Sequence, residues 1–179
     1  MTTPDPASST IIFPIVKVVI AGDIGVGKTS LIRRYCTDTF EESHGATGGV
    51  DFQIKIVDID SRSVKLSIWD IAGQEKFGAF RDTFYRGAKA IALVYDLTGP
   101  GTMETLPRWH AEVAQICPTA RFVIVGNKND LERKTSREQV EAWASSIDLP
   151  YFETSALTGE GVNGLFTTLT RLAMTKKSK

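Results

Sequence analysis

The sequence predicts an α/β fold in which a six-stranded, mostly parallel sheet with one antiparallel edge strand is flanked by helices. Apolar runs of strand length alternate with stretches of helix length along the chain. Short polar motifs follow several of these runs, which is where open α/β sheets bind ligands. With 179 residues, 42% of them hydrophobic, the chain can bury one substantial core, so we expect a single domain.

The alternation gives the order of the elements. We expect strands at 15–21, 50–59, 63–69, 90–96, 121–126 and 150–153, and helices at 28–36, 79–87, 104–116, 137–146 and 162–174. The runs 50–59 and 63–69 are separated only by Asp60-Ser61-Arg62, which predicts a hairpin. The other strands are linked through helices and should be parallel.

Two local signals mark where helices begin. Ser136 and Gln139 have the spacing of a capping box at the start of the helix 137–146. Pro107 has no backbone N–H, so it must lie in the first turn of the helix 104–116 or kink it.

The first strand leads into a glycine-rich loop with the pattern G-x-x-x-x-G-K-[ST]. The run Ile15 to Ala21 is rich in valine and isoleucine, which predicts a buried strand, and the pattern follows it as Gly22 to Thr29. Its glycines permit a turn that directs N–H groups toward phosphates, and the helix beginning at Lys28 adds its positive end. Lys28 is expected to pair with the β- and γ-phosphates, and the Thr29 hydroxyl to ligate Mg²⁺. An ordinary glycine-rich turn is the alternative.

The second strand of the hairpin ends in a carboxylate, followed by a glycine and a glutamine. Asp70 ends the run Val64 to Trp69, at the sheet edge where a magnesium ion could be held, through a water. Gly73 has no side chain, so its N–H can approach a γ-phosphate closely. Gln74 would then lie beside the position of an attacking water. Asp70 could instead cap a turn at the strand end.

Two motifs near the ends of the last strands predict guanine recognition. Asn127-Lys128-Asn129-Asp130 follows one strand, and Thr154-Ser155-Ala156 follows the other. Asp130 can accept two hydrogen bonds from adjacent N–H groups of guanine, a donor pair that adenine lacks, and an unpaired buried acceptor costs about 1–3 kcal/mol. Lys128 would lay its stem along the base, and the Ala156 N–H would meet the guanine oxygen. A polar turn of this composition is common in isolation, so the prediction depends on the loop upstream.

With these four motifs in this order, the chain resembles the small GTPases of the Ras superfamily, and most closely their Rab branch. The resemblance runs from about Ile15 to Met174. Rab-like stretches stand at Gly49-Val50-Asp51-Phe52, Lys65-Leu66-Ser67-Ile68-Trp69, Phe84-Tyr85-Arg86-Gly87-Ala88 and Leu93-Val94-Tyr95-Asp96-Leu97-Thr98. The resemblance implies a P-loop NTPase of the small G-domain type. It also implies a molecular switch that binds GTP or GDP with Mg²⁺, hydrolyses GTP slowly and signals to effectors in vesicle trafficking.

Carried over by position, the resemblance implies roles for residues outside the motifs. Thr47 is expected to coordinate Mg²⁺ only in the GTP state, and Phe40 to pack against the guanine. Phe52, Trp69 and Phe84 would form an aromatic patch for effectors, although such residues can also be ordinary half-buried aromatics. Thr47 could merely precede the strand 50–59. The complete expected set is Asp23, Ile24, Gly25, Val26, Gly27, Lys28, Thr29, Ser30, Phe40, Thr47, Gly73, Asn127, Lys128, Asp130, Ser155, Ala156 and Leu157 at the nucleotide, Thr29, Thr47 and Asp70 at the metal, and Gln74 and Lys28 in catalysis.

The chain departs from the Rab pattern at three positions expected near the γ-phosphate. Ile24 stands where relatives carry glycine or serine, and its stiff side chain should crowd the space of Gln74. Gly48 replaces an isoleucine, which removes an apolar effector contact and should loosen the first switch. His44 stands where many relatives carry a tyrosine, with a solvent-exposed histidine as the alternative.

The sequence is therefore compatible with two functional classes. Gln74 favours an enzyme that hydrolyses GTP slowly, whereas Ile24 leans toward a nucleotide-dependent binding module with negligible hydrolysis. A metabolic P-loop kinase would leave the Asn-Lys-x-Asp motif unexplained.

Composition and charge argue against several classes of protein. The formal net charge is zero, which argues against the basic footprint of nucleic-acid binding. Cys36 and Cys117 have neither metal spacing nor a disulfide framework, so we expect a reducing compartment and two small buried hydrophobes. No apolar run approaches 18 residues, and no signal peptide begins the chain, so we expect a cytoplasmic protein. We expect a monomer whose partners, by resemblance, are an exchange factor, a GTPase-activating protein and effectors.

Both ends of the chain fall outside the expected G domain, 11–175. Residues 1–10 are polar and proline-bearing, which predicts a disordered lead-in, and 176–179 form a short basic tail. Rab proteins usually end in prenylated cysteines, but no cysteine follows Cys117 here. Either a tail is missing from this sequence or this relative is not lipidated. Lysines near an anionic surface contribute only about 1 kcal/mol each, so membrane attachment stays undecided.

Overall fold

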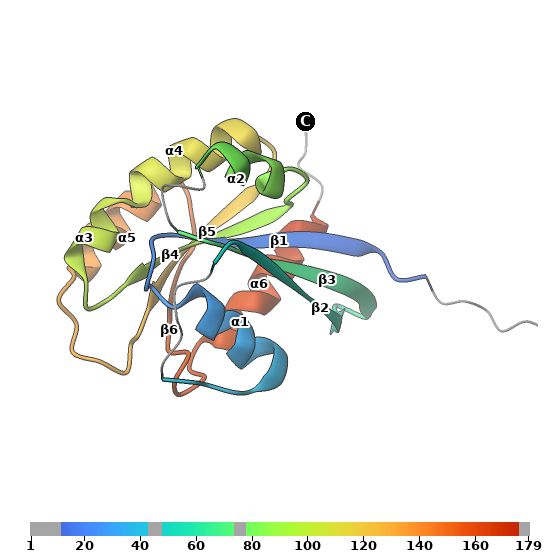
Figure 1. The fold of residues 1–179 in the computed structure, drawn as a ribbon, viewed down its shortest axis with the longest axis horizontal. Helices are drawn as coiled ribbons and strands as arrows, with labels where there is room; N and C mark the ends of the chain where they lie inside the picture. Colours follow the sequence, from blue (N-terminus) through green and yellow to red (C-terminus); the bar gives the residue numbers. More distant parts are fainter. Residues whose placement is uncertain (1–11, 43–47, 74–77, 176–179) are drawn as a thin grey trace, which may run out of the picture.

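One six-stranded sheet runs through the molecule (Figure 1). The structure is a computed structural model that describes residues 12–42, 48–73 and 78–175. Its strands are β1 (Ile15–Ala21), β2 (Val50–Ile59), β3 (Arg62–Ile71), β4 (Ala90–Asp96), β5 (Arg121–Asn127) and β6 (Tyr151–Thr154), in the spatial order β2-β3-β1-β4-β5-β6. Neighbouring strands are parallel except β2 and β3, which pair antiparallel. The predicted sheet with one antiparallel edge strand is confirmed.

A two-residue turn joins β2 to β3. Ile59 pairs with Arg62, so Arg62 belongs to β3 and the link is shorter than the sequence suggested. Asp60 and Ser61 both have positive φ, 50° and 64°. Such a pair is typical of the type I′ turns whose twist matches that of the flanking strands, so the predicted hairpin is confirmed.

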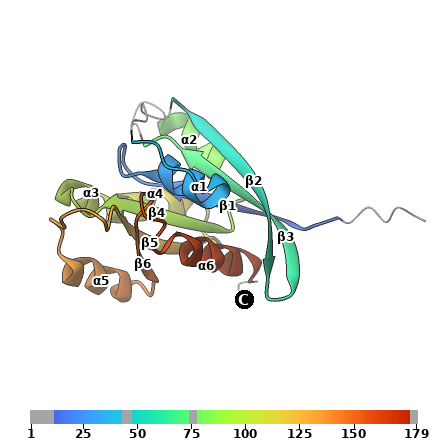
Figure 2. The same ribbon diagram turned by 90° about the horizontal axis from the view of Figure 1, so that it is seen from below.

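Helices cover both faces of the sheet. They are α1 (Lys28–Thr37), α2 (Gly78–Tyr85), α3 (Pro100–Glu104), α4 (Leu106–Ile116), α5 (Arg137–Ser146) and α6 (Val162–Met174). Helices α1 and α6 pack on one face, and α2, α4 and α5 on the other (Figures 1 and 2). Because successive strand residues point to opposite faces, Val18 and Ile20 pack under the first pair while Val19 and Ala21 pack under the second layer. All four are fully buried, as is typical of parallel strands.

The helix predicted at 104–116 is present as α4, which begins two residues later than expected, and the short helix before it was not predicted. Helix α3 ends at Glu104 and α4 begins at Leu106, with Pro107 in its first turn. Because Pro107 has no N–H, it cannot donate to the carbonyl of Met103, and a continuous helix would lose that bond. The placement of Pro107 in a first helical turn is confirmed.

Helix α5 begins with the predicted cap. The Ser136 Oγ accepts a hydrogen bond from the backbone N–H of Gln139 at 3.2 Å. The bond satisfies one of the first N–H groups of the helix, which have no partner within it.

The strand order reverses at β1, which pairs with β3 on one side and β4 on the other. In open α/β sheets the crevice outside the carboxyl ends of the strands at such a point is where ligands bind. The fold therefore predicts a ligand site at the loops that follow β1, β3 and β5. Among the helices of the described residues, none combines the length and the apolar character needed to cross a bilayer.

Candidate functional site

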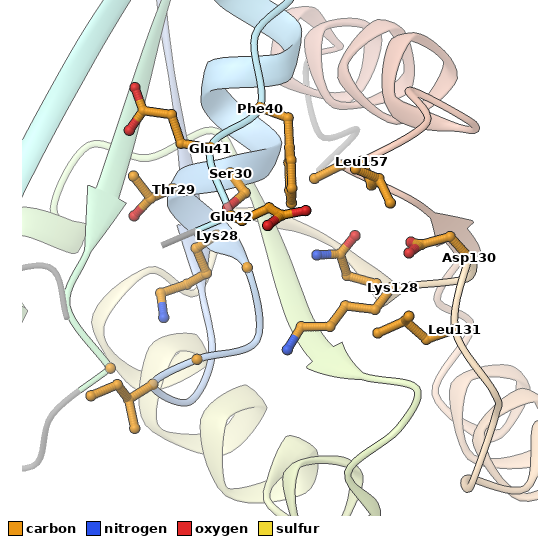
Figure 3. Close-up of a pocket in the computed structure, with 16 residues that line it drawn as sticks. Lys28, Thr29, Ser30, Phe40, Glu41, Glu42, Lys128, Asp130, Leu131 and Leu157 are labelled. Carbon is orange, nitrogen blue, oxygen red and sulfur yellow. The ribbon is translucent and has the colours of Figure 1, made fainter. Parts of the chain in front are cut away.

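A pocket of about 380 Å³ opens at the carboxyl edge of the sheet (Figure 3). Its lining comes from the loop after β1, the start of α1, the segment before β2, and the loops that follow β3, β5 and β6. The lining residues are Ile24, Gly25, Gly27, Lys28, Thr29, Ser30, Phe40, Glu41, Glu42, Gly73, Asn127, Lys128, Asp130, Leu131, Ala156 and Leu157. Most residues predicted at the nucleotide are thus brought together.

The loop after β1 turns into α1 through glycines in the left-handed region. Gly25 and Gly27 have φ of 79° and 97°. A Cβ on Gly27 would lie 2.3 Å from the Asn127 Nδ2, so this glycine is also required by the close approach of β5. Helix α1 begins at Lys28, and its first N–H groups have no partner within the helix. The start of α1 therefore presents at the pocket wall the N–H groups that typically bind anions.

The Lys28 ammonium is buried beneath this loop. Its Nζ donates to the carbonyl oxygens of Gly22 at 2.9 Å and Asp23 at 2.8 Å, and the residue is only 6% exposed. Burial lowers the pKa of Lys28 to about 8, although the carboxylates of Asp70 and Asp23 favour the charged form. A bound phosphate would add negative charge here and hold the lysine protonated.

A hydroxyl and a buried carboxylate form the candidate metal centre. Thr29 Oγ1 donates to the Asp70 Oδ2 at 2.5 Å, and Asp70 is 3% exposed. The other oxygen, Oδ1, is buried and has no hydrogen-bond partner within the described part of the chain. Burial also raises the pKa of Asp70, an effect that a cation would reverse.

This pair fits magnesium better than a metal that needs a protein cage. The described residues hold no group of three or more His, Cys, Asp or Glu side chains arranged to bind a metal. Mg²⁺ is commonly bound by one or two protein oxygens, with waters and substrate phosphates completing its shell. An orphaned oxygen on Asp70 beside the Thr29 hydroxyl matches that requirement.

Asn127 joins the two halves of the pocket. Its Nδ2 donates to the Val26 carbonyl at 3.0 Å, and its Oδ1 accepts from the Thr154 hydroxyl at 3.1 Å. The residue is 1% exposed. Both polar atoms of the amide are thus bonded to protein, so Asn127 ties the glycine-rich loop to β6 beside the pocket.

Lys128 and Asp130 line the opposite end of the pocket. Lys128 has a φ of 71°, and its Nζ lies 2.6 Å from the Asp96 carboxylate, so its aliphatic stem is held along the wall. Asp130 Oδ1 accepts from the Ser155 hydroxyl at 2.6 Å. Ser155 Oγ in turn accepts from the N–H of Thr158 at 3.1 Å. Figure 3 shows both pocket residues beside Leu131 and Leu157.

The sequence did not single out two residues that hold this end together. Arg34 of α1 donates from Nε to the Ala156 carbonyl at 2.8 Å and from Nη2 to the Leu157 carbonyl at 2.7 Å. No local pattern signals these contacts, because more than a hundred residues separate the partners. Asp96 did carry a signal, since it is a carboxylate at the end of a buried strand, as Asp70 is.

Some predicted site residues lie elsewhere. The Val26 side chain is buried in the core, and the Asp23 side chain points to α4, so both could meet a ligand only through their backbone. Ser155 lies behind Asp130 and is fully buried. Gln74 and Thr47 lie outside the described residues, as does His44.

The three aromatic residues predicted for effectors form one stack. The ring centroids of Phe52 and Trp69 are 5.3 Å apart, and those of Trp69 and Phe84 are 6.2 Å apart. Phe52 is 51% exposed. Lys17 Nζ lies 3.9 Å from the centre of the Trp69 ring. The contiguity that the patch requires is therefore present, while its role stays a prediction.

Comparisons with known proteins find relatives that match most of the chain. The model of the Ras family matches residues 17–175. The chain is 42% identical over 164 residues to Ras-related protein SEC4 of Saccharomyces cerevisiae, which covers 90% of this chain and 76% of the relative. It is 43% identical over 153 residues to Ras-related protein Rab-30 of Homo sapiens, covering 84% and 75%. It is 38% identical over 158 residues to Ras-related protein Rab-1D of Dictyostelium discoideum, covering 87% and 78%.

Proposed function

We propose how the site acts, starting from one premise: the chain belongs to the Ras family, and it is a Rab-like small GTPase that hydrolyses GTP to GDP. The pocket would hold the guanine nucleotide with its phosphates over the start of α1 and its base between Lys128 and Asp130. One observation carries this orientation. The buried ammonium of Lys28 and the acceptor carboxylate of Asp130 lie at opposite ends of one pocket, as the two ends of a nucleotide require.

The chain's own groups would stabilise the charge that develops during phosphoryl transfer. Lys28 uses two of its three N–H donors on the carbonyls of Gly22 and Asp23, so the third would donate to a phosphate oxygen, and the loop N–H groups would add fixed dipoles. Thr29 and Asp70 would hold Mg²⁺, which when bound neutralises charge on the phosphates. Gln74 would orient the attacking water, and Thr47 would complete the metal site in the GTP state.

Regulators and effectors follow from family membership in general terms, and we propose a monomer that meets them through the stack of Phe52, Trp69 and Phe84. The exposed ring of Phe52 is contiguous with the half-buried rings of Trp69 and Phe84, which supports this docking face. We place the protein in the cytoplasm and in membrane trafficking. Peripheral membrane association would need a lipidated segment or another anchor.

Nucleotide binding tests the proposal directly. The purified chain, stripped of nucleotide, is titrated with fluorescent GDP, a non-hydrolysable GTP analogue and the matching ATP analogue, with and without Mg²⁺. We expect both guanine nucleotides to bind at least about a hundredfold more tightly than the adenine nucleotide, because a site built to hydrogen-bond one edge rejects a ligand that lacks it. Equal affinities would overturn the assignment of Asp130.

A further inference from the structure

The side chain of Asp23 ties the phosphate loop to α4. Its Oδ1 accepts from the Trp109 indole Nε1 at 2.9 Å, and its Oδ2 accepts from the Thr105 hydroxyl at 2.6 Å. The Arg108 guanidinium lies 3.8 Å from Oδ1. The backbone carbonyl of the same residue accepts from Lys28 at 2.8 Å. Asp23 therefore holds the phosphate-binding lysine with one group and α4 with another.

Trp109 also contacts α2 on its ring face. The Arg81 guanidinium carbon lies 4.7 Å from the centre of the Trp109 ring, and Arg81 Nη2 lies 3.3 Å from Glu112 Oε1. Trp109 is 2% exposed and Arg81 is 7% exposed. One buried indole thus lies between the phosphate loop and α2, and Asp23, Trp109 and Arg81 are here called the Trp109 bridge.

The bridge couples the two elements it joins. A buried cation is costly unless it is paired, so Arg81 depends on the indole face and on Glu112. A shift of α2 would separate Arg81 from that ring. A shift of the loop would strip Asp23 of its indole and hydroxyl donors. Each displacement disturbs the same tryptophan, so the two positions are not energetically independent.

The part of the chain between the two elements adds a second contact. Gly73, which precedes α2, lines the pocket. A Cβ on Gly73 would lie 2.5 Å from the carbonyl carbon of Asp23. The backbone of Gly73 is therefore packed on the backbone of the same residue whose side chain Trp109 holds.

We propose that Trp109 is a positioning residue for nucleotide binding and hydrolysis. It fixes Asp23, and through it Lys28, in the geometry that receives phosphate. Through Arg81 it makes that geometry depend on the position of α2. This role rests on the proposed function of the pocket.

Two substitutions separate the two contacts of the bridge. Trp109→Phe removes the N–H but keeps an aromatic face for Arg81. Arg81→Met removes the cation but keeps the apolar stem. Trp143→Phe is the control, because Trp143 of α5 meets His110 edge-on and belongs to neither contact.

Dissociation rates of fluorescent GDP and of a non-hydrolysable GTP analogue are measured by stopped flow, with thermal unfolding of each loaded variant beside them. We expect Trp109→Phe to release both nucleotides about tenfold faster, because a hydrogen bond to a charged group that organises the loop is lost. Arg81→Met should speed release of the GTP analogue several-fold and change GDP release by less than twofold. Trp143→Phe should change neither rate.

The double variant tests coupling. If the bridge is one unit, Arg81→Met should have a smaller effect on release of the GTP analogue in the Trp109→Phe background than in the parent. Strictly additive effects, or equal changes in Trp109→Phe and Trp143→Phe, would overturn the proposal.

Because the loss of Trp109 could impair folding, Asp23→Ala and Asp23→Asn give an independent comparison. The asparagine keeps an acceptor for the indole and should retain more of the parent's affinity than the alanine, and equal losses would contradict the bridge.

Measurements on the unsubstituted chain distinguish failure of this inference from failure of the proposed function. If the unsubstituted chain does not bind guanine nucleotide, the proposed function is refuted. If it binds tightly and Trp109→Phe releases nucleotide at the same rate, only the role of Trp109 is refuted.

Discussion

Ser155 donates a 2.6 Å hydrogen bond to Asp130, joining loops that follow two different strands. Ser155 is fully buried and is itself held by the N–H of Thr158, so the carboxylate is fixed from behind. Pre-organised acceptors bind a ligand without paying to be ordered first. The proposed guanine end of the pocket is therefore a composite of the loops after β5 and β6.

Asp130→Asn should change base selectivity. The substitution replaces one acceptor oxygen by an NH₂ donor, which opposes the N–H groups of guanine and suits a carbonyl at the same edge of xanthine. We expect weaker GTP binding and effective competition by XTP. Displacement of fluorescent GDP by GTP and by XTP measures both.

Asp148→Asn is the matched control for this change, because Asp148 is exposed and its φ of 54° suits asparagine. It should leave the affinity ratio at the parent's value. An unchanged ratio in Asp130→Asn would remove Asp130 from the base site.

Thr29→Asn should impair Mg²⁺-dependent binding of GTP more than binding of GDP. The hydroxyl that contacts Asp70 is lost, and the γ-phosphate makes GTP more dependent on the ion. We expect the ratio of the two affinities to fall by about tenfold, as loss of about 1.4 kcal/mol would produce. Titrations at several Mg²⁺ concentrations measure it. Thr37→Asn on the exposed end of the same helix should leave the ratio of GTP to GDP affinity unchanged. If Thr29→Asn also leaves this ratio at the parent's value, the metal assignment is refuted.

Nucleotide binding should take up protons near pH 8. In the nucleotide-free protein burial lowers the pKa of Lys28 to about 8, whereas phosphate would favour its charged form. The unfolded chain keeps this proton to higher pH, so Lys28 makes the nucleotide-free protein more stable as pH rises above 8. Calorimetry of GDP binding at pH 8.5 in buffers of different ionisation enthalpy should show uptake of a fraction of one proton. Uptake of none at this pH would contradict the depressed pKa.

Trp69 should report the nucleotide state. Its ring lies between Phe52 of β2 and Phe84 of α2, so a movement of α2 on GTP binding would change the environment of the indole. We expect the emission to differ between GDP and a non-hydrolysable GTP analogue. The difference should become smaller in Trp69→Phe, where Trp109 still contacts α2 and the phosphate loop, and persist in full in Trp143→Phe. An undiminished difference in Trp69→Phe would show that the stack is insensitive to the switch.

The sheet and the pocket could be predicted because their signals are local. A buried strand that runs into a glycine-rich turn and a helix fixes where Lys28 lies. The short polar link after Ile59 predicts the hairpin and with it the antiparallel edge strand, although the turn is one residue shorter than expected. Carboxylates and amides at strand ends gather at one edge because parallel strands share a direction.

Contacts between distant helices could not be predicted in this way. Nothing near Arg34 in the sequence indicates that it binds the carbonyls after Ser155. Asp23 lies in the glycine-rich loop, where the sequence predicts contact with the nucleotide. Its carboxylate instead accepts a hydrogen bond from Trp109, because α4 packs on the sheet beside the loop. No pattern predicted the short helix α3, whereas Pro107 correctly indicated the first turn of α4.

Ile24 forms part of the pocket wall and lies against Gly73. It is 53% exposed and lines the pocket. The position of a Cβ on Gly73 would be 2.5 Å from the Ile24 nitrogen, so the two backbones are in contact. Gln74 follows Gly73 directly in the chain. A β-branched side chain is stiff at χ1 and cannot readily swing away from this space.

Replacing Ile24 by glycine or serine should raise intrinsic GTP hydrolysis several-fold. The smaller residue leaves room for Gln74 and for an arginine supplied by a GTPase-activating protein, and a misplacement of about 1 Å can cost about a hundredfold in rate. GTP affinity should stay nearly constant, because loop N–H groups and Lys28 bind phosphate whatever the side chain at 24. Single-turnover hydrolysis of the parent and both variants measures the effect, with Leu131→Ala as a control at the base end of the same pocket. Coincident rates in the parent and both variants would show that Ile24 packs without obstructing the water, and the slow hydrolysis expected here would need another cause.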